Sequence, residues 1–245
     1  MCRMLGIISR KPVPSSYLKD FRVLTEKGKV PKGAKEPGHK DGWGIVYYDG
    51  QMPRYLGRQP TNAMEDERYG KACENLDKLK VSGVLLAHLR KRSVGSTTSE
   101  NTSPFISENW CFAHNGTIRD FFPKVEGERK DMTDSERFFR LLLQENERTR
   151  GVIEETIGQV IDRVAGVYDY SSLTFLLSDG DSLYAYADVS DTGMKDYYRL
   201  MYAKNDDMVI FTQEPIWKKY WTNVPNRCLV SVNKELRIRS IEFGR

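Results

Sequence analysis

The order of the apolar patterns along the chain constrains its fold more than any other feature. Strand-like runs concentrate toward both ends, whereas two long helical patterns, TDSERFFRLLLQENER (133–148) and VIEETIGQVIDRV (152–164), occupy the middle. This is not the strict alternation of strand and helix that indicates a parallel doubly wound sheet. We therefore predict an α+β fold in which stacked, mainly antiparallel sheets are flanked by helices.

Shorter patterns predict the remaining elements. Two more helices are expected at 15–28 and 64–80, where apolar residues recur at helical spacing. Two hairpins are expected at 43–58 and 172–189, because each has an Asp-Gly pair between two short apolar runs. The other predicted strands are MLGII (4–8), GVLLAHLR (83–90), WCFAHNG (110–116), YYRLMYA (197–203), MVIFT (208–212), CLVSV (228–232) and ELRIRSIEF (235–243).

Length and composition fit one globular domain. The chain has 245 residues, of which 39% are hydrophobic and 29% are charged, as in ordinary globular proteins. No repeat or linker divides it, so we expect a single domain over residues 1–245. The net charge of +4 is too small over this length to indicate nucleic-acid binding by itself.

The absence of targeting signals and the wide spacing of the cysteines predict a cytoplasmic protein. The first residues hold no apolar run long enough for a signal peptide, and no stretch approaches the roughly 20 apolar residues of a membrane helix. The four cysteines, Cys2, Cys73, Cys111 and Cys228, are widely spaced, which argues against a zinc ribbon or a disulfide framework. We expect the last three to pack in the core.

The three histidines interrupt short apolar or glycine-rich segments, GHKDGWG (His39), LLAHLRKRSVG (His88) and FAHNGTI (His114). Together with Cys2 they suggest a metal site, but none shows the short paired spacing that places two ligands on one helical face. We therefore predict no metal ligands. Taken singly, His88 fits a hydrogen-bonded histidine on a buried strand.

Cys2 is an unusual residue to find directly after the initiator methionine, because a thiol at a frayed chain end gains little packing. If Met1 is removed, Cys2 carries a thiol and a free α-amine on one Cα. The ordinary pKa is about 8.5 for the thiol and about 8 for the amine, so the amine can accept the thiol proton near neutrality. Position 2 can supply a nucleophile and its base, with a rate that falls below the pKa of the amine.

Taken together, six short motifs resemble the class II glutamine amidotransferases, which are N-terminal-nucleophile hydrolases. The motifs extend from Cys2 to about Asp134 and are most similar to the stand-alone, single-domain branch, whose members begin MCR and carry DGWG. The resemblance implies a four-layer αββα sandwich and an amidohydrolase that acts on glutamine or a γ-glutamyl amide and needs no cofactor. The motifs are MCRMLGI, HKDGWG, AHLRKRSVG, NTSPF, AHNGTI and TDSE.

The resemblance also implies a catalytic role for three residues. Cys2 would attack the side-chain amide carbon of glutamine, release ammonia or an amine, and leave a γ-glutamyl thioester for water to cleave. The side chain of Asn115 and the backbone N–H of Gly116 would stabilise the oxyanion of the tetrahedral intermediate. A glutaminase with an N-terminal cysteine nucleophile is therefore the first hypothesis.

The same resemblance assigns substrate-binding residues. Arg90 would bind the α-carboxylate of the substrate, for which a guanidinium fork is suited, and Asp134 would pair with its α-ammonium group. Ser93 occupies a position where relatives often have a threonine near the substrate. Further candidates from the same motifs are His88, His114 and Trp43.

Several residues depart from the family pattern. Lys91 and Arg92 replace an aromatic and a small residue of synthase relatives, and Val94 replaces a polar residue. Lys91, Arg92 and the basic segment Lys27–Lys40 predict a basic rim near the leaving group of the substrate. Such a rim would favour an amine that bears a carboxylate or phosphate. The chain ends at Arg245 with no room for a second catalytic domain. Either a separate synthetase subunit uses the ammonia, or the reaction is hydrolysis of a γ-glutamyl amide.

Two alternatives lie outside this class. A catalytically silent regulatory or binding module could share the fold, and such a protein would keep Met1. A nucleic-acid-associated protein could use Lys27–Lys40 and would bind more weakly as salt increases. That segment fits a solvated loop better, so we expect a small-molecule substrate and neither nucleic acid nor membrane as a partner. The oligomeric state stays open.

Overall fold

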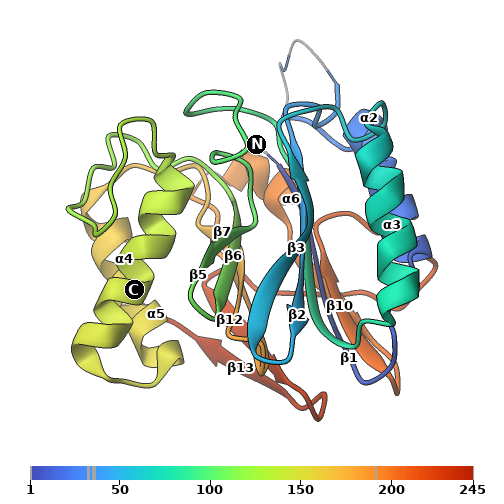
Figure 1. Ribbon diagram of the computed structural model, residues 1–245. Helices are drawn as coiled ribbons and strands as arrows, with labels where there is room; N and C mark the ends of the chain where they lie inside the picture. Colours follow the sequence, from blue (N-terminus) through green and yellow to red (C-terminus); the bar gives the residue numbers. More distant parts are fainter. Residues whose placement is uncertain (1, 32–33, 35–36, 191, 245) are drawn as a thin grey trace.

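Two stacked antiparallel sheets form the centre of the molecule, and helices cover both outer faces (Figure 1). The computed structural model describes residues 2–31, 34, 37–190 and 192–244. Among the described residues, every pair of neighbouring strands is antiparallel, in line with the hairpin-rich sequence. The predicted α+β sandwich with layers in the order αββα is confirmed.

The first sheet has the N-terminal strand in its interior. β1 (Arg3–Ser9) pairs with β4 (Gly83–Leu89) on one side and with β10 (Met208–Thr212) on the other. The residues that follow Cys2 are therefore held by backbone hydrogen bonds from both neighbours. The sheet order is β11 (Thr222–Asn223), β9 (Met201–Lys204), β10, β1, β4, β2 (Trp43–Asp49) and β3 (Met52–Gln59).

The second sheet contains the other predicted hairpin. Both Asp-Gly turns form as expected, since Gly50 and Gly180 have φ of 62° and 90°, a conformation that glycine adopts without a Cβ penalty. The sheet order is β13 (Ile238–Glu242), β12 (Cys228–Asn233), β8 (Ser182–Ala187), β7 (Thr174–Ser178), β6 (Trp110–Asn115) and β5 (Phe105–Ser107).

Alternation along the strands divides the core into layers. On β1, Met4 and Ile8 face the second sheet, whereas Leu5 and Ile7 face the helices on the outer side of the first sheet. All four side chains are buried. The helices over the first sheet are α1 (Ser16–Arg22), α2 (Leu24–Lys27) and α3 (Glu67–Leu79), and those over the second are α4 (Asp134–Thr149) and α5 (Ile153–Val167).

Helix α4 begins where the sequence predicts. The Thr133 side chain accepts a hydrogen bond from the N–H of Glu136 at 3.2 Å, which is one half of a capping box. This cap sets the first turn of the helix at Asp134 and fixes that carboxylate at the end of the helix nearest the N-terminal residues (Figure 1).

The structure differs from the sequence prediction in two helical segments. The helix expected at 15–28 is divided into α1 and α2, and the strand expected at 197–203 begins only at Met201. Residues 195–198 instead form the short helix α6 (Lys195–Tyr198). Helix α6 places the Tyr197 ring against the guanidinium of Arg3, at 4.4 Å from its centroid, so a tertiary contact overrides the local strand preference. In the described part of the chain, no helix combines the length and apolar character needed to cross a membrane.

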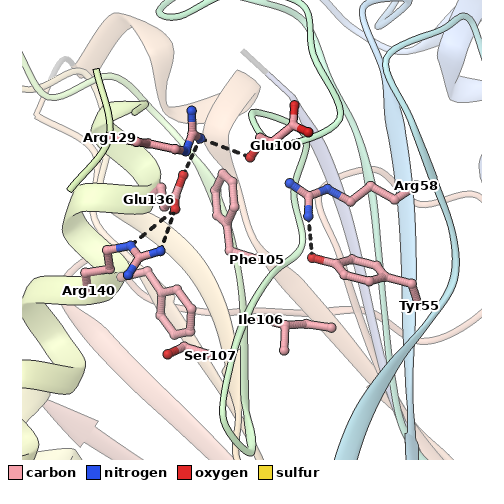
Figure 2. Close-up of a pocket in the computed structure, with 10 residues that line it drawn as sticks. Tyr55, Arg58, Glu100, Phe105, Ile106, Ser107, Arg129, Glu136 and Arg140 are labelled. Atoms are coloured by element: carbon pink, nitrogen blue, oxygen red, sulfur yellow. Dashed lines mark hydrogen bonds and ion pairs between the residues drawn. The ribbon is translucent and has the colours of Figure 1, made fainter. Parts of the chain in front are cut away.

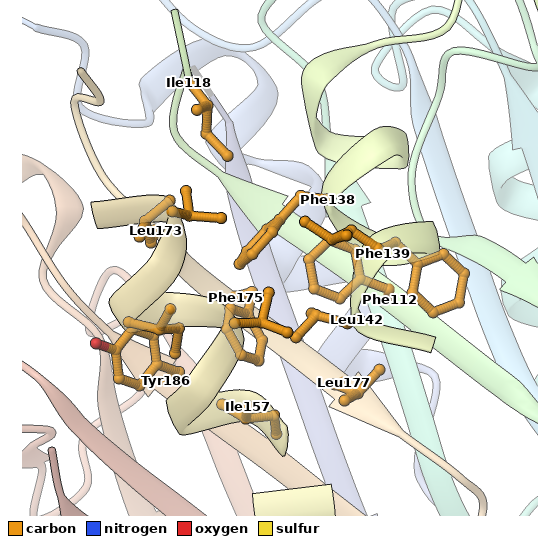
Figure 3. Close-up of a cluster of buried hydrophobic side chains, with 14 of the residues drawn as sticks. Phe112, Ile118, Phe138, Phe139, Leu142, Ile157, Leu173, Phe175, Leu177 and Tyr186 are labelled. Atoms are coloured by element: carbon orange, nitrogen blue, oxygen red, sulfur yellow. The ribbon is translucent and has the colours of Figure 1, made fainter. Parts of the chain in front are cut away.

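A cluster of phenylalanines anchors α4 and α5 to the second sheet (Figure 3). The Phe112 ring of β6 stacks on Phe139 at 5.2 Å and meets Phe138 edge-on at 5.9 Å. Each of the three side chains is no more than 1% exposed. This packing holds Asp134, four residues before Phe138, over the end of β6.

We predict that Phe112→Ala lowers the free energy of unfolding by about 3–5 kcal/mol, because it leaves a cavity among rings that cannot collapse freely. Phe122, which is 73% exposed, is the matched control, and Phe122→Ala should cost less than about 1 kcal/mol. Urea unfolding of both variants measures the difference. Equal losses for the two variants would contradict the central role of this cluster.

Candidate functional site

Cys2 and Asn115 bring the two sheets together at the site. The Cys2 backbone N–H donates to Asn115 Oδ1 at 2.7 Å, and Asn115 Nδ2 donates to the Cys2 carbonyl at 2.8 Å. Cys2 directly precedes β1 of the first sheet, and Asn115 is the last residue of β6 in the second. Two residues separated by 113 positions thus form a closed hydrogen-bonded ring.

Gly116 follows Asn115 at a point where a side chain cannot fit. A Cβ at this position would lie 1.8 Å from the carbonyl oxygen of Ser172. The backbone N–H of Gly116 has no hydrogen-bond acceptor among the residues that the structure describes. Asn115 and Gly116 therefore do not form the hairpin turn that their sequence would suggest alone, and the Gly116 N–H is available to a ligand.

Arg90 lies beside Cys2 at the end of β4. The register pairs Arg3 with Leu89, and one further step places Arg90 next to Cys2. The guanidinium is buried and donates to the carbonyl oxygens of Ser96 and Val94 at 2.9 and 3.1 Å. Arg90 thus organises the loop that follows it. The remaining guanidinium protons are the donors that a substrate carboxylate would use.

Asp134 contributes a buried carboxylate to the same region. Its Oδ2 accepts a hydrogen bond from the N–H of Ile118 at 2.8 Å, and Asp134 is only 6% exposed. Burial is the main cause that raises the pKa of the Asp134 carboxyl to about 6, with a smaller contribution from the nearby Cys2 thiol. Asp134 is therefore ionised at neutral pH and becomes neutral in mild acid.

The environment of Cys2 favours its thiolate. Burial alone raises the pKa of the thiol, but the positive charge at the amino end of the chain and the interaction with His88 outweigh burial and lower the pKa to about 5. His88 lies on β4 two residues before Arg90 and is 2% exposed. Among the described residues, the Cys2 thiol is the partner of its ring.

His114 is held in a structural role. Its Nε2–H donates to the carbonyl of Ser172 at 3.0 Å, so Nδ1 accepts from the Ser135 hydroxyl at 2.9 Å. Burial lowers the pKa of His114 to about 4, and the ring stays neutral near pH 7. It supports the strand end that carries Asn115.

The remaining candidates separate into one at the site and one outside it. Ser93 is exposed and accepts a hydrogen bond at 3.1 Å from the hydroxyl of Thr117, the residue that follows Gly116. Trp43 lies in the helix-side core of the first sheet, where its Nε1–H donates to Asp66 at 3.0 Å. Because alternate residues point to opposite faces of a strand, the structure does not bring Trp43 to Cys2.

Three residues at the site were missed in the sequence. Gln213 is buried and accepts from Asn115 Nδ2 at 3.0 Å. The fully buried guanidinium of Arg3 donates to the Cys2 carbonyl at 2.9 Å and forms an ion pair with Glu214. The available signals were an arginine inside an apolar strand and a Gln-Glu pair directly after the buried run MVIFT.

The basic segment predicted as a rim contacts the loop after Arg90. The Lys91 ammonium donates to the Gly38 carbonyl at 3.3 Å, and the Arg92 backbone N–H donates to Asp41 at 2.8 Å. Lys32, Lys35 and Glu36 lie outside the described residues. The role of this rim in substrate binding stays a prediction.

A separate cleft of about 260 Å³ lies between β3, β5 and α4 (Figure 2). Arg129 and Arg140 both contact Glu136 there, and Arg58 donates to the Tyr55 hydroxyl at 2.7 Å. The residues that line this cleft include no site residue predicted from the sequence. In the described part of the chain, no three His, Cys, Asp or Glu side chains are grouped so that they could hold a metal ion.

Several known proteins resemble this chain in sequence. The family model described as "Glutamine amidotransferases class-II" matches residues 1–212. An uncharacterized protein of Methanocaldococcus jannaschii is 31% identical over 77% of this chain, which spans about half (51%) of that relative. A gamma-glutamyl-hercynylcysteine sulfoxide hydrolase of Mycobacterium tuberculosis is 26% identical over 96% of this chain and 94% of its own length.

Solved structures show the same fold. A glutamine aminotransferase class-II domain protein from Silicibacter pomeroyi superposes with a TM-score of 0.65 at 21% identity and covers 100% of both chains. A structure titled as the allosteric regulatory enzyme of purine biosynthesis superposes with a TM-score of 0.71 at 16% identity, over 99% of this chain and 49% of the other. At these identities the likeness concerns the fold alone.

We predict that alkylation of Cys2 by iodoacetamide has a midpoint well below pH 8.5, since the charged amino end and His88 lower the pKa of this thiol and the thiolate is the reactive form. Burial raises the pKa of Cys73 to about 11 and that of Cys111 to about 12. These two thiols are the internal controls and should stay unmodified. His88→Asn should move the Cys2 midpoint upward. Peptide mapping by mass spectrometry at each pH gives the profile, and a Cys2 midpoint near 8.5 would contradict it.

Proposed function

Because the chain belongs to the class II glutamine amidotransferases, we propose that it hydrolyses the side-chain amide of glutamine or of a related γ-glutamyl amide. The hydrogen-bonded ring between Cys2 and Asn115 carries this proposal. The name of the M. tuberculosis relative, which aligns with 96% of this chain, supports a γ-glutamyl amide as the substrate.

In the proposed reaction, removal of Met1 makes Cys2 the amino-terminal residue. The α-amine of Cys2 then replaces the charged amino end that lowers the pKa of the thiol, and it accepts the thiol proton at neutral pH. The thiolate attacks the γ-carbonyl carbon, the C–N bond breaks, and the α-ammonium gives its proton to the departing ammonia or amine. Water then cleaves the γ-glutamyl thioester, with the free α-amine as its base.

The oxyanion of the tetrahedral intermediate would receive hydrogen bonds from Gly116 and Asn115. The Gly116 N–H is available, whereas both protons of Asn115 Nδ2 already have acceptors, the Cys2 carbonyl and Gln213. Asn115 must therefore exchange one of these bonds during the reaction. Gln213 orients the amide until that exchange and is a positioning residue for it.

The amino-acid head of the substrate would lie between Arg90 and Asp134. Arg90 offers guanidinium protons to the α-carboxylate, and Asp134, ionised above about pH 6, pairs with the α-ammonium group. Ser93, in the loop after Arg90, accepts a hydrogen bond from the Thr117 hydroxyl and so joins this loop to the residue that follows Gly116. Glutamine and all γ-glutamyl amides share such a head.

The partner follows from the better substrate. Glutamine would require an ammonia-accepting synthetase subunit to use the product, whereas a γ-glutamyl amide needs only water. We propose the second case for a single catalytic domain over residues 1–245. The free thiols of Cys2, Cys73, Cys111 and Cys228 accord with the cytoplasmic location that we propose.

We predict an amino terminus at Cys2 in the purified protein, since a free α-amine is needed as the base. A glutamine-like diazoketone should add covalently to Cys2 alone, and Cys2→Ala should abolish turnover. Cys228→Ala is the matched control and should keep its chemistry, because that thiol is buried away from the site. Intact-mass and peptide analysis give the result; retention of Met1 without labelling would favour a catalytically silent module.

We predict that Arg90→Ala and Asp134→Asn chiefly raise KM, whereas Asn115→Ala chiefly lowers kcat, by about 10²–10³-fold, because the oxyanion forms only after attack. In the wild type, KM should rise as pH falls through about 6, where Asp134 becomes protonated. The kcat should fall as pH drops below the pKa of the Cys2 α-amine, because protonation removes the base for thioester hydrolysis. Steady-state kinetics from pH 4.5 to 8 test this split, and an unchanged KM in Arg90→Ala would refute the clamp.

A further inference from the structure

An open cleft of about 790 Å³ adjoins the proposed site. Its size falls within the range of about 300–1,000 Å³ that is usual for small-molecule sites, and ammonia alone would not need it. Ser93 and Thr117, which are joined by a hydrogen bond of 3.1 Å, stand at the boundary between the cleft and the proposed glutamyl site.

Contacts place this cleft at the γ-amide end of the substrate. Thr117 follows the oxyanion donor Gly116, and its N–H donates to Ser171 Oγ at 3.0 Å. The Tyr198 hydroxyl donates to the same oxygen at 2.9 Å, and the Tyr198 carbonyl accepts from Gln213 at 3.4 Å. Gln213 in turn contacts Asn115. The cleft wall is thus attached to both oxyanion donors, where the leaving group departs.

A short ladder positions one cation in the cleft. The N–H of Arg119 donates to the Asp169 carbonyl at 2.8 Å, and the N–H of Ser171 donates to the Thr117 carbonyl at 2.9 Å. Alternation along this extended segment turns Thr117 and Arg119 to the cleft, whereas Ile118 is buried and its N–H binds Asp134. The backbone of the substrate site therefore also fixes Arg119.

The position and charge of Arg119 suit a carboxylate on the leaving group. Three extended residues span about 10 Å from Gly116 to Arg119, and the arginine side chain covers part of that distance. Its guanidinium is exposed and has no ion pair or hydrogen bond within the described residues. The carboxylate of Asp169 also lines the cleft, so a singly charged carboxylate fits better than a phosphate dianion.

Part of the remaining cleft wall, beside Ser171 and Ser190, is aromatic and apolar. Tyr168 and Tyr170 line it together with Ala165 and Met194. The Tyr168 ring is fixed by an edge-on contact with Phe121, with centroids 5.0 Å apart. Such walls bind an apolar or aromatic side chain.

Resting on the proposed function, we propose that this cleft binds the amine half of the substrate as an α-amino acid with an aromatic or apolar side chain, whose carboxylate pairs with Arg119. The substrate class is then a γ-glutamyl-amino acid. The leaving amino acid takes its proton from the Cys2 α-ammonium, and water completes hydrolysis of the thioester.

The test compares γ-glutamyl-phenylalanine with γ-glutamyl-phenethylamide, which lacks only the second carboxylate, and with glutamine. The wild type should have the highest kcat/KM for γ-glutamyl-phenylalanine. Arg119→Gln should lower the ratio of kcat/KM between the first two substrates about fivefold, as expected for one partly solvated ion pair. Arg54→Gln, at an exposed position on β3, is the matched control and should keep the wild-type ratio.

Three results would overturn the inference. One is a wild-type ratio near 1, and another is a ratio that Arg119→Gln leaves unchanged. In the third, Arg92→Gln lowers the ratio and Arg119→Gln does not, which would place carboxylate recognition at the basic rim. Any of these with glutamine still hydrolysed would leave the proposed function intact.

A binding measurement separates the two proposals if turnover is absent. In the Cys2→Ala background, γ-glutamyl-phenylalanine should bind with a Kd about fivefold lower than that of the Arg119→Gln double variant, measured by calorimetry. Equal affinities would overturn the cleft assignment. Wild-type protein that hydrolyses none of the three substrates would refute the proposed function independently of this result.

Discussion

The hydrogen-bonded ring between Cys2 and Asn115 is the contact on which the rest of the site depends. It fixes the first residues of a chain end, which would otherwise be frayed, and it joins the central strand of one sheet to an inner strand of the other. Because β1 is paired on both sides, Cys2 has no freedom to move away from β6. The stacking of the two sheets therefore sets the position of the thiol relative to Asn115 and Gly116.

The charged groups around this ring have different effects on the Cys2 backbone, the Cys2 thiol and the Asp134 carboxyl. The buried Arg3 guanidinium holds the Cys2 carbonyl and is neutralised by Glu214, so it fixes the backbone without exposing a free charge. His88 and the amino end lower the pKa of the thiol, while burial raises the pKa of Asp134. At neutral pH both the Cys2 thiol and the Asp134 carboxyl are therefore in their ionised forms.

Strand alternation explains which motif residues reach the site. Trp43 and His114 belong to motifs that resemble those of the family. Trp43 nevertheless faces the helices, and both ring nitrogens of His114 are hydrogen-bonded, to Ser135 and to Ser172. Arg119 carries no motif, but the ladder between 117–119 and 169–171 turns it toward the cleft beside Thr117. Motif membership therefore identifies the region of a site, whereas the direction of each side chain depends on the register of its strand.

Local physical chemistry made much of this protein predictable from its sequence. The Asp-Gly hairpins, the cap of α4 at Thr133 and the apolar periods specified most elements, because each depends on residues within a few positions. The candidate site residues came from six motifs and their resemblance to a known family. Tertiary structure alone decided that residues 195–198 form a helix whose Tyr197 packs against Arg3, that Gln213 contacts Asn115, and that the His88 ring lies beside the Cys2 thiol. Those outcomes depend on contacts between strands that are far apart in the chain, which no local pattern of residues encodes.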